Sequence, residues 1–152
     1  MISLFKNPCV VDPVLGELRH SWGKWRGLIS AQGQATVPLV LPGTSKAPDP
    51  HAIGMVRHLD DDLPRWRADI SKELFNHLEP YAQEVDPARF GHIKSPEDVW
   101  PHVKLVHVAV FAERGELTLE LGYQTEWDEE HTLGAFFRNE KLLHLNGSVG
   151  AP

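Results

Sequence analysis

The chain has 152 residues, of which 41% are hydrophobic, and this size fits one ordinary domain, residues 1–152, around a single core. Its 15 Lys and Arg residues against 21 Asp and Glu give a formal charge of -6, which argues against a nucleic-acid-binding protein. The single cysteine, Cys9, excludes an intramolecular disulfide and a zinc site built on paired thiolates.

Hydropathy along the chain bears on its location. No run of 18 apolar residues occurs, so we expect no membrane span and no membrane partner. The first residues, MISLFKNPCVVDP, lack the basic segment and apolar run of a secretory signal, because Pro8 and Pro13 interrupt them. We therefore expect a cytoplasmic protein.

The N-terminal part, about residues 15–41, contains short groups of β-forming residues separated by glycines. This pattern predicts a three-stranded meander with strands over 16–20, 25–31 and 35–41. Pro38 has no backbone N–H to donate to a neighbouring strand. Its position therefore predicts that the third strand lies at an edge of the sheet or carries a bulge.

Helix signals dominate the middle of the chain. Asp49 followed by Pro50 is typical of a cap and a first helical residue. The run Asp60, Asp61 and Asp62 before Leu63 and Pro64 gives a similar signal, so we predict a second helix that begins after this run, at Leu63, and ends near residue 85. The apolar stripe of this helix comprises Leu63, Trp66, Ile70, Leu74, Leu78 and Tyr81.

A last short helical turn is expected within residues 95–103. Ser95 stands at the cap position, Pro96 at the first helical position, and two acids occupy the first turn, where carboxylates are favourable. Pro101 should end this turn.

After residue 104 the hydrophobic period changes from near 3.6 to 2, which predicts strands. Val106, Val108 and Val110 should share one face of the first strand, and residues 133–137 and 142–146 should form the last two. The face of the second strand comprises Leu117, Leu119, Leu121 and Tyr123.

The expected fold is therefore α+β, with an N-terminal meander over about 15–41, a helical middle over about 49–103 and a C-terminal meander over about 104–147. We predict an antiparallel sheet of about seven strands, three N-terminal and four C-terminal. The central helices should pack on one face of this sheet.

The stretch YQTEWDEEHTLGAFF, residues 123–137, concentrates acids, a tryptophan and a histidine between apolar runs. In an extended chain only Glu129 and His131 could ligate a metal from one side, whereas in a turn Asp128 and Glu130 could join them. The spacing matches neither HExxH nor a calcium loop. A polar turn whose Trp127 packs back on the sheet is the favoured interpretation, and a partner-binding loop is the next.

Other chemistry-bearing patterns are weak. No serine lies in GxSxG or SxxK, no phosphate loop occurs, and Cys9 has no histidine nearby, so we predict no catalytic residue, no metal and no cofactor. His107 and His144 alternate with apolar neighbours, as sheet histidines do. Trp22 and Trp25 are typical of turn and strand aromatics rather than of a base-stacking platform.

Four segments together carry a resemblance: LGELRHSWGKWRGLIS, DPHAIGMVRHL, ADISKELFNHLEPYAQEV and LELGYQTEWDEEHTLGAFF. They resemble a group of small bacterial proteins with a late W-D-x-E-H-G block, which is similar to the immunity proteins of polymorphic toxin systems. The block maps to Trp127, Asp128, Glu130 and His131, with Thr132 where the group usually has glycine. That departure indicates that the backbone need not adopt a positive φ here.

The resemblance implies a non-catalytic protein that binds and neutralises a cognate toxin in the cytoplasm. Its acidic charge would suit a basic toxin, for instance a nuclease. The alternative is a small metal-dependent enzyme in which Asp128, Glu130 and His131 join His107 or His144. The candidate partner-binding residues are Trp127, Asp128, Glu129, Glu130, His131, Asp60 and Asp61.

Overall fold

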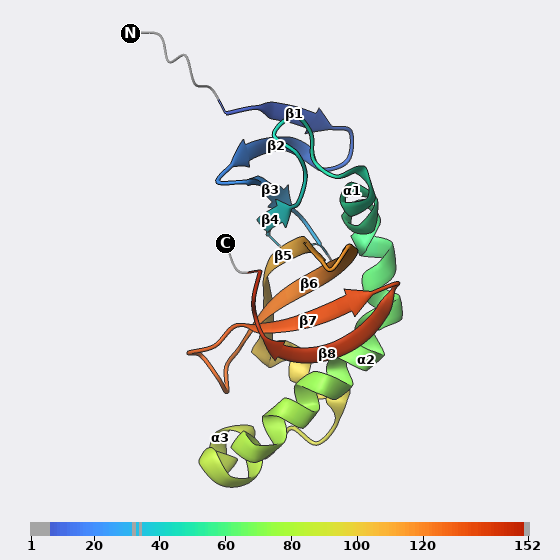
Figure 1. Cartoon of the computed structure of the whole chain (residues 1–152). Helices are drawn as coiled ribbons and strands as arrows, with labels where there is room; N and C mark the ends of the chain where they lie inside the picture. The colour runs from blue at the N-terminus through green and yellow to red at the C-terminus, as the bar shows by residue number, and fades with distance from the viewer. Residues whose placement is uncertain (1–6, 32, 34, 151–152) are drawn as a thin grey trace, which may run out of the picture.

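The structure is a computed structural model that describes residues 7–31, 33 and 35–150. It is an α+β fold in which eight strands form one sheet, and neighbouring strands follow one another in chain order (Figure 1). The strands are β1 (Cys9–Asp12), β2 (Gly16–Ser21), β3 (Lys24–Ile29), β4 (Val37–Leu41), β5 (Val103–Glu113), β6 (Glu116–Thr125), β7 (Leu133–Arg138) and β8 (Lys141–Gly147).

The sheet is mixed rather than purely antiparallel, which corrects the sequence prediction. All neighbours pair antiparallel except β4 and β5, which are parallel because the helical middle of the chain crosses over between them. The strands also divide four and four instead of three and four. The crossover consists of α1 (Pro50–Arg57), α2 (Leu59–Pro80), the π-helical turn η1 (Tyr81–Val85), α3 (Pro87–Phe90) and the 3₁₀ helix η2 (Pro96–His102).

The strand that the sequence prediction missed is β1. It pairs antiparallel with β2, from Cys9 opposite Arg19 to Asp12 opposite Gly16. Four residues are too few to establish a period of two, and the prolines on both sides obscured the segment further.

The prediction that β4 lies at an edge or carries a bulge was wrong, because β4 lies between β3 and β5. Its parallel pairing with β5 joins only Leu39 to Val108 and Val40 to Ala109. Pro38 precedes this short ladder and pairs on the β3 side, opposite Leu28. A proline is tolerated here because the ladder with β5 does not include it.

The predicted helix starts differ in outcome. Asp49 caps α1 as expected, since its Oδ1 accepts from the backbone N–H of His51 at 2.8 Å and of Ala52 at 3.1 Å. The second helix begins four residues earlier than predicted, at Leu59, so Asp60, Asp61 and Asp62 lie in its first turn. Carboxylates are favourable both as caps and in the first turn, and the sequence alone did not distinguish these positions.

The core lies between the sheet and helices α1 and α2, which run along one face of the sheet (Figure 1). The predicted apolar stripe of α2 faces it: Leu63, Trp66, Ile70, Leu74 and Leu78 are buried. Trp66 stacks on Phe137 of β7 with ring centroids 4.2 Å apart. Across the residues that the structure describes, no helix is both long and apolar enough to cross a membrane.

A bulge in β5 shifts its register between Leu105 and His107. As a result Leu105, Val108 and Val110 join the core, whereas the sequence predicted Val106 in the place of Leu105. His107 alternates with Val108 and Val110 as predicted and so lies on the opposite face, where it is nevertheless only 2% exposed.

Candidate functional site

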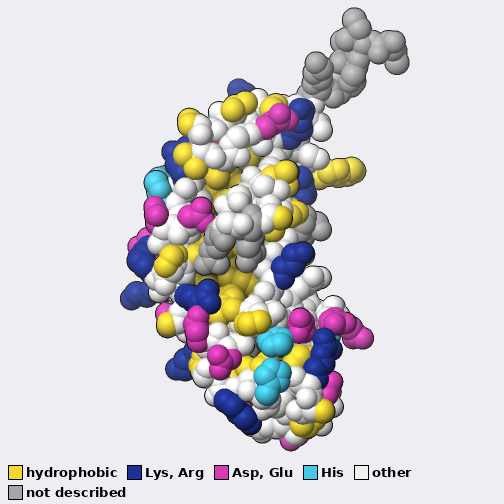
Figure 2. Space-filling view, turned by 180° about the vertical axis from the view of Figure 1, so that it is seen from behind, with side chains coloured by type: hydrophobic (Ala, Val, Ile, Leu, Met, Phe, Trp, Pro, Cys, Tyr) yellow, Lys and Arg dark blue, Asp and Glu magenta, His cyan; other side chains and the backbone are white. Residues whose placement is uncertain are grey.

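The connection between β6 and β7 projects from the sheet as a loop (Figure 1). We call residues 126–131 the acidic loop, because the side chains of Glu126, Glu129 and Glu130 are exposed there. Acidic side chains project from the edge of the molecule where this loop lies (Figure 2). Within the described part of the chain, neither Glu129 nor Glu130 forms an ion pair.

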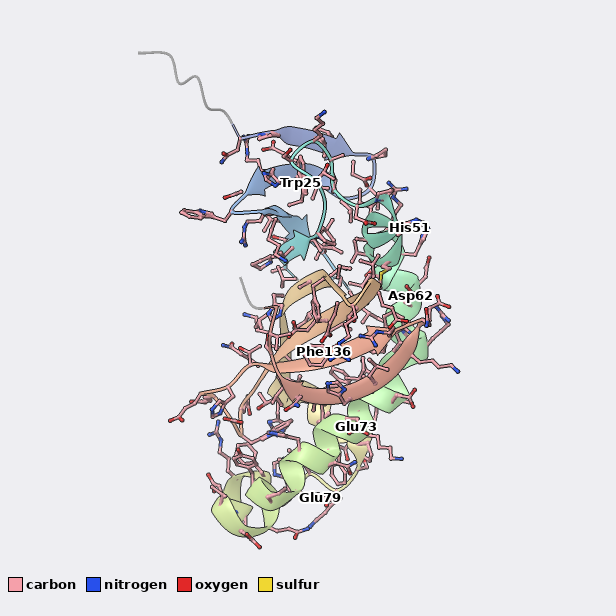
Figure 3. All side chains as sticks on the ribbon, in the orientation of Figure 1. Trp25, His51, Asp62, Glu73, Glu79 and Phe136 are labelled. Carbon is pink, nitrogen blue, oxygen red and sulfur yellow. The ribbon has the colours of Figure 1, made fainter. Side chains whose placement is uncertain are left out.

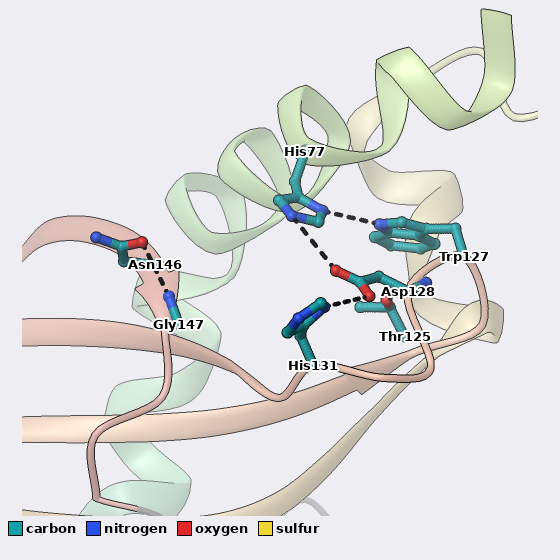
Figure 4. Close-up of polar contacts among 7 residues, drawn as sticks. All are labelled: His77, Thr125, Trp127, Asp128, His131, Asn146 and Gly147. Carbon is teal, nitrogen blue, oxygen red and sulfur yellow. Dashed lines mark hydrogen bonds and ion pairs between the residues drawn. The ribbon is translucent and has the colours of Figure 1, made fainter. Parts of the chain in front are cut away.

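Trp127 anchors the acidic loop from inside. It is 5% exposed, and its indole Nε1 donates a 3.0 Å hydrogen bond to Nδ1 of His77 on α2 (Figure 4). Its ring also meets the edge of Phe90 of α3, with centroids 6.5 Å apart. The predicted inward-packing tryptophan is therefore present, but it packs on the helices rather than on the sheet.

Asp128 ties the loop to itself and to α2. Its Oδ1 accepts a hydrogen bond from Nδ1 of His131 at 2.8 Å, and its backbone N–H donates to Oγ1 of Thr125 at 3.2 Å (Figure 4). Its other oxygen lies 4.0 Å from Nε2 of His77. The carboxylate thus lies between two imidazoles and is itself only 11% exposed.

The two imidazoles respond to this carboxylate in opposite ways. The hydrogen bond from His131 to Asp128 raises the pKa of His131, helped by the negative charge. Burial lowers the pKa of His77, and the charge of Asp128 only partly opposes this effect. Because Nδ1 of His77 accepts from Trp127, its neutral ring carries the proton on Nε2, toward Asp128.

Beside the loop lies a pocket of about 420 Å³, lined by the start of β5 and the end of β6. His102 and Glu126 face each other there, with Nδ1 2.6 Å from Oε2. The backbone N–H of Glu126 also donates to the carbonyl oxygen of His102 at 3.0 Å. Lys104 and Glu129 also line this pocket, so it presents both charges.

The other predicted partner-binding residues lie elsewhere. Asp60 and Asp61 are exposed in the first turn of α2, whereas His77 lies near its other end. At 1.5 Å per residue, the two candidate surfaces are roughly 25 Å apart along the helix. They are therefore separate acidic surfaces rather than one site.

The metal-dependent alternative has no converging ligand set. Among the described residues, no three His, Cys, Asp or Glu side chains lie close enough together to hold a metal ion. His107 lies beside Glu120, and His144 packs against Phe136 with ring centroids 5.0 Å apart. Asp128 and His131 remain a hydrogen-bonded pair.

A buried polar group on the other face of the sheet was missed by the sequence analysis. Glu120 is fully buried, and its Oε1 lies 3.6 Å from Nε2 of His107. The carboxylate also accepts from the backbone N–H groups of Val149 and Gly150, while Oγ of Ser148 lies 3.3 Å from the imidazole. Residues 148–150 therefore cover the pair.

Burial alone would raise the pKa of Glu120, but the hydrogen bonds from His107 and Ser148, with the charge of His107 and the Gly150 N–H, lower it on balance. The ionised carboxylate is thus favoured inside the sheet because each of its oxygens has a donor. We call Glu120 and His107 the buried pair.

Glycines make room for the buried pair. A Cβ on Gly122 would lie 2.1 Å from the His107 ring, and one on Gly134 would lie 2.4 Å from Oε1 of Glu120. Both glycines interrupt strand patterns, in LELGY and LGAFF, and a glycine inside a strand is a sequence signal of another group approaching closely. Thr132, in contrast, has no positive φ, as its departure from the glycine of the resembled block predicted.

The chain matches one protein family, which is described as a domain of unknown function (DUF6985). The match covers residues 14–151, from the end of β1 to the tail that covers the buried pair. No curated protein and no solved structure gave a match.

Proposed function

We propose that this chain, which belongs to the DUF6985 family, is a non-catalytic immunity protein that binds and neutralises a toxin inside the cell. The observation that carries the proposal is the construction of the acidic loop. Buried Trp127 and nearly buried Asp128 hold it in place, while Glu129 and Glu130 face outward. Such a loop presents charge without needing a catalytic group.

Pre-organisation favours this function. A loop that is already fixed loses less conformational entropy when a partner binds than a loop that must first be ordered. The anchor at His77 and the hydrogen bonds of Asp128 to His131 and Thr125 supply this order before binding. The neighbouring pocket at His102 gives a partner side chain a place to enter.

The distribution of charge indicates a basic partner. Residues 58–152 contain eighteen Asp and Glu against nine Lys and Arg, whereas residues 1–57 contain three against six. The negative field is therefore concentrated in the part of the chain that carries the loop. Such a field speeds association with a basic surface and disfavours acidic competitors.

The resemblance of the WDEEH block to immunity proteins supplies the class of partner. Trp127, Asp128 and His131, which belong to this block, are the residues that hold the loop. On this proposal they act as scaffold, and the outward acids contact the toxin. Trp127 contributes to binding only indirectly, because its ring is already covered by the helices.

The test is co-expression of the chain with the product of its adjacent gene, scoring growth rescue and co-purification at low and high salt. Glu129→Lys with Glu130→Lys should weaken the complex by about tenfold or more, and high salt should weaken the unmodified complex. Absence of both rescue and complex would refute the proposal.

Two matched variants with the same change of charge locate the surface. Asp69→Lys with Glu73→Lys, on α2, is the control and should leave the complex unchanged. Asp60→Lys with Asp61→Lys reports on the second predicted surface. A loss confined to this last variant would move the interface from the loop to the start of α2.

A further inference from the structure

A large cavity lies at the opposite end of α2 from the acidic loop. It has a volume of about 740 Å³, within the usual range for ligand pockets, and lies between the helices and the ends of two hairpins. His51 and Asp62 stand on its helical side (Figure 3). Its apolar floor includes the stacked rings of Trp66 and Phe137.

Gly54 opens the helical wall of this cavity. It lies inside α1, where glycine is less favourable than alanine. No atom of the described chain outside its own neighbourhood lies within 4 Å of the place where a Cβ would stand, and its φ is not positive. Internal packing therefore does not require glycine here, whereas a group entering the cavity would gain space from it.

Two buried donors without a partner belong to residues that line the cavity. They are Nε1 of Trp66 and Nε of Arg138, and among the described residues only Arg57 has another such atom. Protein atoms cover both groups, and a buried N–H without an acceptor lowers stability, so this wall of the cavity is not packed for stability alone.

The rim of the cavity is acidic. Asp49, Asp62, Glu116 and Glu140 line it, and Arg138 is the single Lys or Arg of the lining. Glu116 lies 3.1 Å from Arg138, and Arg65, which lies outside the lining, pairs with both Asp62 and Glu140. Four carboxylates therefore face two guanidinium groups, which leaves the rim negative on balance. An apolar floor below an acidic rim is complementary to an apolar group next to a cation.

We propose that this cavity binds a segment of the partner protein in which Lys or Arg stands next to an aromatic or aliphatic side chain. The apolar side chain packs on Trp66 and Phe137, and the cation lies at the acidic rim. The assignment of the occupant rests on the proposed function, because that function supplies a basic partner protein.

A peptide titration tests the cavity without the partner. The probes are N-acetyl-phenylalanyl-arginine amide and its glutamate analogue, added to ¹⁵N-labelled protein while the Trp66 indole signal is followed. The arginine peptide should shift this signal and bind about tenfold more tightly than the glutamate peptide. No shift at Trp66, or equal binding of both peptides, would overturn the assignment.

Two variants at one position control for folding. Gly54→Phe should fill the cavity and abolish the shift, whereas Gly54→Ala should keep it and stabilise α1. Circular dichroism establishes that both variants fold. Retained binding in folded Gly54→Phe also overturns the assignment.

Co-expression with the adjacent gene product separates the two proposals. Loss of rescue in Gly54→Phe, with rescue retained in Gly54→Ala, supports the cavity as a toxin contact. Rescue that survives Gly54→Phe but is lost on reversing Glu129 and Glu130 overturns the cavity assignment and leaves the proposed function standing. No rescue by the unmodified chain overturns the proposed function, and with it the toxin segment as occupant, whatever the peptides show.

Discussion

Two of the groups that place a carboxylate beside histidine differ in burial. Asp128 lies at the surface between His77 and His131, whereas Glu120 is fully buried beside His107. Both carboxylates are held by hydrogen bonds, but only the first group leaves acids exposed next to it.

The difference follows from solvent access. The side chain of His131, which donates to Asp128, is 67% exposed, so water screens this pair and its hydrogen bond fixes the loop without adding greatly to global stability. Glu120 has no exposed surface through which solvent could replace a lost partner, so every donor matters to the free energy of unfolding. The first group suits display of a surface, and the second suits fastening residues 148–150 to the sheet.

The largest predicted effect is on stability. Glu120→Ala should lower the free energy of unfolding by about 3–5 kcal/mol, because it leaves the N–H groups of Val149 and Gly150 and the buried imidazole without their acceptor. Urea denaturation measures the change. Glu113→Ala, an exposed glutamate of the same sheet, is the control and should stay within about 0.5 kcal/mol. A loss below about 1 kcal/mol for Glu120→Ala would mean that its burial carries no such penalty.

Gly122→Ala should be the next most damaging change. The new Cβ would stand 2.1 Å from the His107 ring, which has to move within a packed face of the sheet. We expect a loss of about 1–3 kcal/mol in the same denaturation experiment. Gly147→Ala is the matched control, since nothing lies within 4 Å of its Cβ position. Equal stability of the two variants would show that the buried pair adjusts freely.

The sequence predicted those parts of the fold that have a local period. The stripe of α2 from Leu63 to Leu78 and the buried face of β6 from Leu119 to Tyr123 are both as expected. The sequence did not predict the parallel pairing of β4 with β5, since that depends on how a crossover of some sixty residues returns to the sheet. The bulge that brings Leu105 into the core was also hidden, because the sequence alternates regularly through Val106 and Val108 and gives no sign of an extra residue.

The candidate site was predictable in composition but not in contacts. The acids of the loop and the inward tryptophan were readable from WDEEH between two apolar runs. The partner of Trp127 is His77, fifty positions earlier in the chain, and no local pattern links the two. The buried pair was partly readable from Gly122 and Gly134, but only contact across strands identifies Glu120 and His107 as the reason for them.

Trp127→Phe should have a smaller effect than either change at the buried pair. Phenylalanine keeps most of the buried ring but cannot donate to His77, so the loss should be about 1 kcal/mol. Backbone amide exchange of residues 126–131 should accelerate more than that of β6. Binding of the proposed toxin should weaken although the variant has the same net charge. This result would distinguish the effect of loop order on binding from the effect of loop charge. Unaltered exchange would show that the indole hydrogen bond does not hold the loop.

The smallest predicted effect is a difference in titration between two imidazoles that share one carboxylate. By NMR, the pKa of His131 should lie above the ordinary histidine value of about 6.5 and that of His77 below it. Asp128→Asn should lower both, because Asp128 favours the charged form of each ring, and the fall should be larger for His131, whose hydrogen bond to Asp128 is the main cause of its shift.

The pKa shifts of the two histidines change the stability of the protein with pH in opposite directions. Because folding raises the pKa of His131, its contribution to stability is complete below about 6.5 and is lost as pH rises through the higher folded value. Because folding lowers the pKa of His77, its contribution is present above about 6.5 and is lost as pH falls through the lower folded value.

The loop also becomes more negative as His131 loses its proton, so binding to a basic toxin should strengthen with rising pH across that range. In Asp128→Asn this step should move to lower pH, whereas a step that stays in place would assign it to another group.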